Sequence, residues 1–440
     1  MKLWETEDKK KDKVIEDFLA GKDTEKDQDL VHYDILGNLA HVEMLKETGI
    51  ISQSEFEDVK NALQDIRKKK IEIRPDEEDI HTKIENLVTQ KTEAGKKIHT
   101  ARSRNDQVLL DTRLYMKDHV LQISEQASEI VVKLLEKSEN YENLLMPGYT
   151  HYQQAMPSTG GLWFSSIAEA FVDDLKVLEG LYPVINSNPL GAAAGYGTNL
   201  PIDRDYTTQR LGFDSTQVNS TYTISSRGKT EYMLLNSLNN FLLDINRFCT
   251  DITLFNTQEF RLVSLDSDLT TGSSIMPQKN NPDTAEVLKG RTNRLISKSI
   301  QLSSILTNNI SGYNRDTQET KMILMDYIED FSEILEVFLL MIKGLEINKT
   351  QCKEIMTNDI FSAHKSNEMV EDGIPFREAY RKIKEEEFEF DESKIFESEG
   401  SLGSPSDLGL SNISGKLEET DAFWRNERER FKEVKTSLLN

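Results

Sequence analysis

Residues 234–255 read LLNSLNNFLLDINRFCTDITLF, and large apolar side chains recur through this stretch in steps of four and three. They are Leu234, Leu238, Phe241, Ile245, Phe248, Ile252 and Phe255. This spacing places them along one face of an α-helix. Because steps averaging three and a half residues suit helices that cross at about 20°, the stretch predicts one member of an elongated helical bundle.

Four further segments carry apolar side chains at helical spacing. Residues 96–146 contain neither glycine nor proline and carry an apolar stripe over 120–134. Similar stripes cover 164–182, 288–306 and 324–342. We therefore predict an all-α fold with five long helices at its centre.

The chain of 440 residues is long enough for several domains, and we predict three. Residues 1–105 form a mostly helical N-terminal domain, 106–347 form the central bundle, and 348–440 form a small C-terminal domain. Within the last of these, residues 384–410 are acidic and then rich in serine, glycine and proline, which predicts a partly flexible segment.

Composition excludes several classes of function. Acidic residues outnumber basic ones by 76 to 53, so the surface repels nucleic acid and anionic lipid. Only Cys249 and Cys352 are present, without metal-ligand spacing, which predicts a reducing, cytoplasmic compartment. The charged N-terminus does not resemble a signal peptide, and no apolar run approaches the roughly 20 residues of a membrane span. Motifs of nucleotide-binding loops and of zinc proteases are absent from the sequence.

The connector TTGSSIMPQKNNPD, residues 270–283, predicts a carboxylate-binding turn. Its small residues let backbone N–H groups face a ligand, Ser273 and Ser274 supply hydroxyls, and Lys279 supplies positive charge. Two alternatives stay open: a nucleophilic serine, although the GxSxG elbow is missing, and a simple helix entrance with Pro282 and Asp283 in its first turn.

Two further connectors carry candidate functional side chains. GYTHYQQAMP, residues 148–157, places His151 in a loop, where an imidazole can act as an acid or a base. HTARSRNDQV, residues 99–108, packs arginines and amides whose donors match a carboxylate, or which form structural ion pairs. Four other histidines have helix-like surroundings and are predicted to be packing or surface residues: His32, His41, His119 and His364.

Taken in order, six motifs resemble the argininosuccinate lyase family of the aspartase/fumarase superfamily. They are EDIHTKIE, HTARSRNDQV, MPGYTHYQQAMP, PLGAAAGYGTNLPIDR, TGSSIMPQKNNPD and YNRDTQETK. The likeness runs from Trp4 to Ala379. It implies a homotetramer with a twenty-helix core and active sites shared between subunits. It also implies reversible cleavage of L-argininosuccinate to L-arginine and fumarate, the last step of arginine biosynthesis, without metal or cofactor.

The resemblance also implies roles for individual residues. Ser273 is the expected base, Lys279 the carboxylate clamp, and His151 the second acid–base group, hydrogen-bonded by Glu286. The expected substrate contacts are Asn38, His81, Ser103, Arg104, Asn105, Thr150, Arg227, Asn281, Tyr313, Gln318 and Lys321. Asn38 stands where a serine is frequent, Met156 where glutamine is usual, and Asn280 where lysine is usual, so substrate affinity is the property these departures affect.

Three rival functions compete with this prediction. The elimination loop is shared with adenylosuccinate lyase, fumarase and aspartase, but TARSRNDQ and YNRDTQ favour the argininosuccinate branch. A catalytically silent, crystallin-like homologue would keep the fold alone, whereas this chain keeps Ser273, His151, Glu286 and Lys279. A helical interaction scaffold would leave the polar, glycine-rich connectors unexplained.

Overall fold

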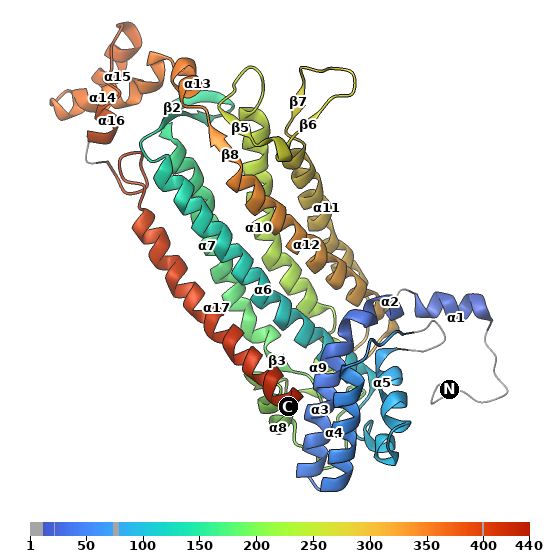
Figure 1. Cartoon of the computed structure of the whole chain (residues 1–440). Coiled ribbons are helices and arrows are strands. Elements are labelled where there is room, and N and C mark those ends of the chain that lie inside the picture. Colours follow the sequence, from blue (N-terminus) through green and yellow to red (C-terminus); the bar gives the residue numbers. More distant parts are fainter. Residues whose placement is uncertain (1–11, 22, 74–78, 398–399) are drawn as a thin grey trace.

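A computed structural model describes residues 12–21, 23–73, 79–397 and 400–440 of the chain (Figure 1). All five predicted long helices are present in it and lie side by side along one axis. They are α6 (Arg104–Asn140), α7 (Gly160–Ile185), α10 (Lys229–Phe255), α11 (Asp283–Ile305) and α12 (Glu319–Lys343). The predicted all-α class is confirmed, since the strands are short and form two-stranded pairs.

The stripe on α10 forms the centre of the hydrophobic core. Its seven apolar side chains are all buried. Phe241 meets Phe171 of α7 edge to face at 5.1 Å between ring centroids, and Phe248 meets Phe338 of α12 at 5.9 Å. Such contacts add to the free energy that burial of the rings supplies, so the aromatic side chains fix how α7, α10 and α12 pack.

The N-terminal helices cluster at one end of the bundle (Figure 1). They are α1 (Lys13–Ala20), α2 (Asp23–Asp27), α3 (Val31–Glu47), α4 (Gln53–Arg67) and α5 (Ile80–Thr89). The short α8 (Arg204–Arg210), α9 (Ser220–Ser225) and the parallel pair β3 (Ser187–Asn188) and β4 (Ser215–Thr216) lie at the same end. Here α6 begins with a capping box between Ser103 and Asp106, which fixes where the longest helix starts.

Two hairpins and a small helical group lie at the opposite end (Figure 1). The hairpins are β1 (Leu145–Thr150) with β2 (Gln153–Thr159), and β6 (Thr271–Gly272) with β7 (Asn280–Asn281). The pair β5 (Val263–Leu265) and β8 (Leu345–Ile347) joins the bundle to α13 (Lys349–Ile355), α14 (Ser362–Glu371), α15 (Phe376–Glu385) and α16 (Lys394–Glu397).

The last helix, α17 (Leu410–Leu439), returns along α6 and α7 over 30 residues. Trp424 is buried against Tyr182 of α7, with ring centroids 5.4 Å apart. The apolar face of α17 therefore adds to the bundle core, while α13 to α16 lie beyond the end of the bundle. The three domain boundaries stay a prediction. Over the described ranges, no helix combines the length and apolar character needed to cross a membrane.

Candidate active site

A cavity of about 150 Å³ opens at the N-terminal end of the bundle. Its lining comes from segments far apart in the sequence: Leu19, Asp27, Asp79, His81, Arg104, Asn105, Val108, Arg227, Tyr313, Arg315, Gln318 and Lys321. Seven of the predicted substrate contacts are among them. The start of α6, the segment before α10 and the start of α12 meet here because the bundle brings these helix ends together.

The cavity carries charged groups of both signs, and two of its cations, Arg104 and Lys321, form ion pairs. Arg104 donates from Nη2 to Glu85 at 2.8 Å, and its Nε lies 3.7 Å from Asp79. Lys321 forms a close, buried ion pair with Asp27. Guanidinium and ammonium donors held in this way are ready to bind carboxylates of a ligand, and the aspartates are ready to bind its cationic groups.

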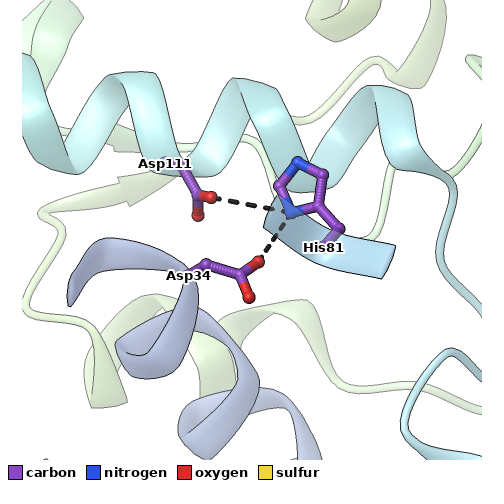
Figure 2. A group of neighbouring side chains, drawn as sticks. All are labelled: Asp34, His81 and Asp111. Atoms are coloured by element: carbon purple, nitrogen blue, oxygen red, sulfur yellow. Dashed lines mark hydrogen bonds and ion pairs between the residues drawn. The ribbon is translucent and has the colours of Figure 1, made fainter. Parts of the chain in front are cut away.

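The buried His81 lines the cavity, and Figure 2 shows it beside Asp34 and Asp111. Its Nδ1 donates to Asp34 Oδ1 at 2.6 Å, and Asp111 Oδ2 lies 3.7 Å from the same nitrogen. Burial alone would lower the pKa of His81, but Asp34 and then Asp111 outweigh it and raise the pKa to about 9. His81 is therefore a cation at neutral pH.

Two of the predicted substrate contacts lie behind the cavity and do not line it. Asn38 is buried, with its amide bonded to Asp34 and Arg102. Ser103 caps α6, where its hydroxyl accepts from the backbone N–H of Asn105 at 3.3 Å. Both residues position groups that reach the cavity. Their direct contact with a bound molecule stays a prediction.

Four acidic groups near the cavity were not predicted from the sequence. Asp79 stands beside His81 in the EDIH motif and could have been found there, since its side chain caps α5. Asp27, Asp34 and Asp111 lie on helices without any local motif, and only the packing of those helices brings them to the cavity. Arg315, which was also missed, lies in the YNRDTQ motif.

His151 lies at the tip of the hairpin β1–β2, at the other end of the bundle (Figure 1). His151 and Tyr152 form the two-residue turn, with φ of 54° and 59°, as the tightest hairpins require. Thr150 and His151 are exposed, and Met156 follows on β2, partly exposed. The imidazole of His151 is therefore exposed to solvent at the tip of the hairpin.

The GSSIMPQKN segment forms the loop between β6 and β7. The hydroxyl of Ser273 accepts from the backbone N–H groups of Ile275 at 3.3 Å and Met276 at 3.2 Å. Two such donors favour negative charge on that oxygen. Lys279, Asn280 and Asn281 close the loop, and α11 follows with Glu286 exposed in its first turn.

The cavity and the two hairpins are far apart in one chain (Figure 1). Helix α6 alone has 37 residues and separates Asn105 from the β1–β2 hairpin, which corresponds to about 55 Å at 1.5 Å per residue. Among the described residues, no hydrogen bond links His151 to Glu286 or either hairpin to the cavity. One chain thus holds the predicted site residues in separate groups.

Comparison with known proteins agrees with this architecture. A family model described as lyase matches residues 8–296. The argininosuccinate lyase of Bacteroides thetaiotaomicron is 38% identical over 411 residues, covering 91% of this chain and 92% of that protein. The argininosuccinate lyase of Thermotoga neapolitana is 38% identical over 389 residues, covering 87% of this chain and 98% of that protein.

Solved structures show the same fold at lower identity. EDDS lyase in complex with formate superimposes with a TM-score of 0.78 at 22% identity, covering 93% of this chain and 91% of that one. The class II fumarase of Schistosoma mansoni gives 0.68 at 14% identity, covering 86% and 90%. The chain therefore has the elongated all-α bundle fold of these solved structures. The chain belongs to the argininosuccinate lyase family, whose members are carbon–nitrogen lyases.

Proposed function

We propose that the protein catalyses the reversible elimination of L-argininosuccinate to L-arginine and fumarate. The observation that carries the proposal is the charged cavity, which gathers motif residues as distant in sequence as Asn105 and Lys321 around both acidic and basic groups. The names of the relatives support the same reaction. With L-arginine as the product, the reaction is the last step of arginine biosynthesis. We place it in the cytoplasm because the sequence has only two cysteines, Cys249 and Cys352.

Substrate binding follows from the charges of the cavity. Argininosuccinate carries several carboxylates, an amino group and a guanidinium group. Arg104, Arg227 and Lys321 offer cationic donors to the carboxylates, and Gln318 offers an amide. Asp79 offers a carboxylate to a cationic part of the substrate. A cavity with both signs of charge therefore suits a substrate with both.

Elimination begins at the loop of residues 273–279. Ser273 Oγ, as an alkoxide, takes the proton from the carbon next to a succinyl carboxylate. The electron pair moves onto that carboxylate, where Lys279 and loop N–H groups stabilise the doubly charged group. The pair then forms the double bond of fumarate as the carbon–nitrogen bond breaks. Donors arranged before the reaction supply most of the rate enhancement.

His151 acts on the leaving group. As an imidazolium it gives a proton to the guanidino nitrogen that departs with arginine, and Glu286 hydrogen-bonds the ring and keeps it oriented. Of the two possible assignments, we propose Ser273 as the base and His151 as the acid.

The reaction also requires assembly. Every bundle helix exposes large apolar side chains: Val132, Val177, Val184, Tyr232, Leu243, Val287, Ile300 and Leu340. Other copies of the chain would cover them, and a tetramer would bring the hairpins of some copies to the cavity of another. Exposed apolar faces of this kind are typical of subunit contacts.

The test is to incubate the purified protein with argininosuccinate, adenylosuccinate, malate and aspartate in turn and to follow fumarate by absorbance. The malate reaction is followed in the reverse direction, by the loss of added fumarate as it is hydrated to malate. We expect turnover of argininosuccinate, with arginine and fumarate formed in equal amounts. Turnover of adenylosuccinate alone would overturn the proposal.

A further inference from the structure

A line of buried polar groups runs from Arg102 to the wall of the cavity. Arg102 donates to Asn38 Oδ1 at 2.6 Å, and Asn38 Nδ2 donates to Asp34 Oδ2 at 2.8 Å. The other oxygen of Asp34 accepts from His81 Nδ1 at 2.6 Å. The amide of Asn38 thus gives a donor to the carboxylate and an acceptor to the arginine at once.

Burial isolates this line from solvent. Asp34 and Asn38 are each 2% exposed, and His81 is 4% exposed. Asp111 is 1% exposed, and among the described residues its Oδ2 has no hydrogen-bond partner. Because buried carboxylates are stable only next to compensating charge, Asp34 and Asp111 both favour a proton on His81.

The hydrogen bond of Nδ1 to Asp34 decides which ring nitrogen can meet a ligand. Nδ1 faces Asp34 and Asp111 (Figure 2). Nε2 is therefore the ring nitrogen left for a ligand in the cavity that His81 lines. A ring held at one nitrogen by a carboxylate has a fixed orientation.

We propose that Asp34 is a positioning residue that keeps His81 as an imidazolium, whose Nε2–H donates to a carboxylate of the substrate. This inference rests on the proposed function, which supplies a polycarboxylate substrate. Asp111 strengthens the effect, and Asn38 and Arg102 hold Asp34 in place. His81 then acts as a fixed cation, donor at both nitrogens, and not as a second base.

A metal ion is a weaker explanation of the same cluster. Ligand atoms of Asp34, His81 and Asp111 lie within 4.8 Å of one another. However, two ligands bound to zinc at about 2.1 Å are separated by roughly 3 Å or more, and the 2.6 Å between Nδ1 and Asp34 is the distance of a direct hydrogen bond.

Other titratable groups also face His81 and shape its response to pH. Asp34 comes from α3 and Asp111 from α6, while Asp79 caps the histidine's own helix α5. The remaining charged or titratable neighbours of the cluster are Asp27, His99, Arg102 and Arg104. The acidic groups favour the imidazolium, and the arginines oppose it.

The experiment compares Asp34→Asn with the unaltered enzyme between pH 6 and pH 8. We expect KM for argininosuccinate to stay flat in the unaltered enzyme. In Asp34→Asn it should rise about tenfold or more from pH 6 to pH 8, since a charge-assisted hydrogen bond is lost as His81 deprotonates. The value of kcat should change far less than KM. The matched control is Asp174→Asn, which neutralises a buried carboxylate on α7 and should keep KM flat.

A shift of KM in Asp34→Asn that is the same at every pH would overturn the inference, because a merely structural residue acts in that way. If the unaltered enzyme does not cleave argininosuccinate, the proposed function fails, and the inference is then decided by a second measurement. NMR of the unaltered protein labelled at its seven histidines, with His81→Gln to identify the signal, should show the ring titrating well above its ordinary range. Titration of that signal at or below about 6.5 would overturn it.

Discussion

The two ends of the bundle differ in how complete they are. At the N-terminal end, arginines, lysine and aspartates meet in one cavity, where Arg104 and Lys321 form ion pairs. At the other end, His151 and the 273–279 loop are exposed, and Ile275 at the loop tip has 86% of its surface in solvent. One chain therefore places the proposed substrate contacts in its cavity and the proposed reacting groups at the opposite end of the bundle.

The two ends of the proposed site have different tasks. The binding half needs fixed charges, and packing of α3, α5, α6 and α12 supplies them. The proposed reacting groups lie instead on hairpins that are largely exposed in one chain, and loops of this kind commonly carry function. Each prediction below changes one end and leaves the other as it is.

The largest effect is expected from Ser273→Ala in the loop. Turnover should fall by at least about a thousandfold, because the proton acceptor is removed, while KM and assembly should change little. Steady-state kinetics and sedimentation measure the two properties. Ser274→Ala is the matched control and should keep most of the activity, and near-normal turnover of Ser273→Ala would exclude serine as the base.

The next largest effect is expected at the exposed apolar helix faces that we propose as subunit contacts. Ile300 on α11 is 66% exposed in one chain. Ile300→Glu should weaken assembly strongly and with it remove most of the turnover, since a charge buried without a partner in a subunit contact costs several kcal/mol. Sedimentation measures the assembly. Leu402→Glu, in a loop outside the bundle, should leave it unchanged, and a fully active Ile300→Glu monomer would contradict a shared site.

Much of this architecture could be predicted from the sequence, and the limits have a physical cause. Apolar side chains at helical spacing, such as Leu234 to Phe255, mark the buried face of a helix, so the prediction of the five bundle helices is confirmed. The motifs around Arg104 and Tyr313 also led to one cavity. Asp34 and Asp111 were not predicted to lie near the cavity, because no local sequence motif marks a buried carboxylate on a helix. The bonds of Asn38 to Asp34 and Arg102 could not be predicted either, because the sequence shows neighbours along the chain and not across it.

A smaller effect tests the charge on His81. Its pKa is raised to about 9, so the stabilisation it supplies is fully present below about pH 6.5 and is lost as the pH rises through 9. The difference in Tm between the unaltered protein and His81→Gln should therefore become smaller from pH 6.5 to pH 9. His364→Gln, on the distant α14, should show no such narrowing. A gap that stays constant would contradict a buried imidazolium.

The smallest effect is expected where α17 meets the bundle. Lys117 is buried, and its Nζ donates to Asn186 Oδ1 at 2.8 Å and to the carbonyl of Gly212. Burial lowers its pKa to about 7. Lys117→Met should cost roughly 1–3 kcal/mol of unfolding free energy, because these acceptors lose their donor. Chemical denaturation measures this cost, and Lys133→Met, on the exposed face of α6, should cost close to nothing.

The central claim is that loops and cavity of one site come from different copies, and a mixing experiment tests it most directly. Ser273→Ala and Asn105→Ala are each nearly inactive alone under this account. When the two variants are unfolded together and reassembled, about a quarter of the sites should combine an intact loop with an intact cavity. The account predicts that activity then returns to a substantial fraction of the unaltered level. Activity no greater than that of the separate variants would contradict it.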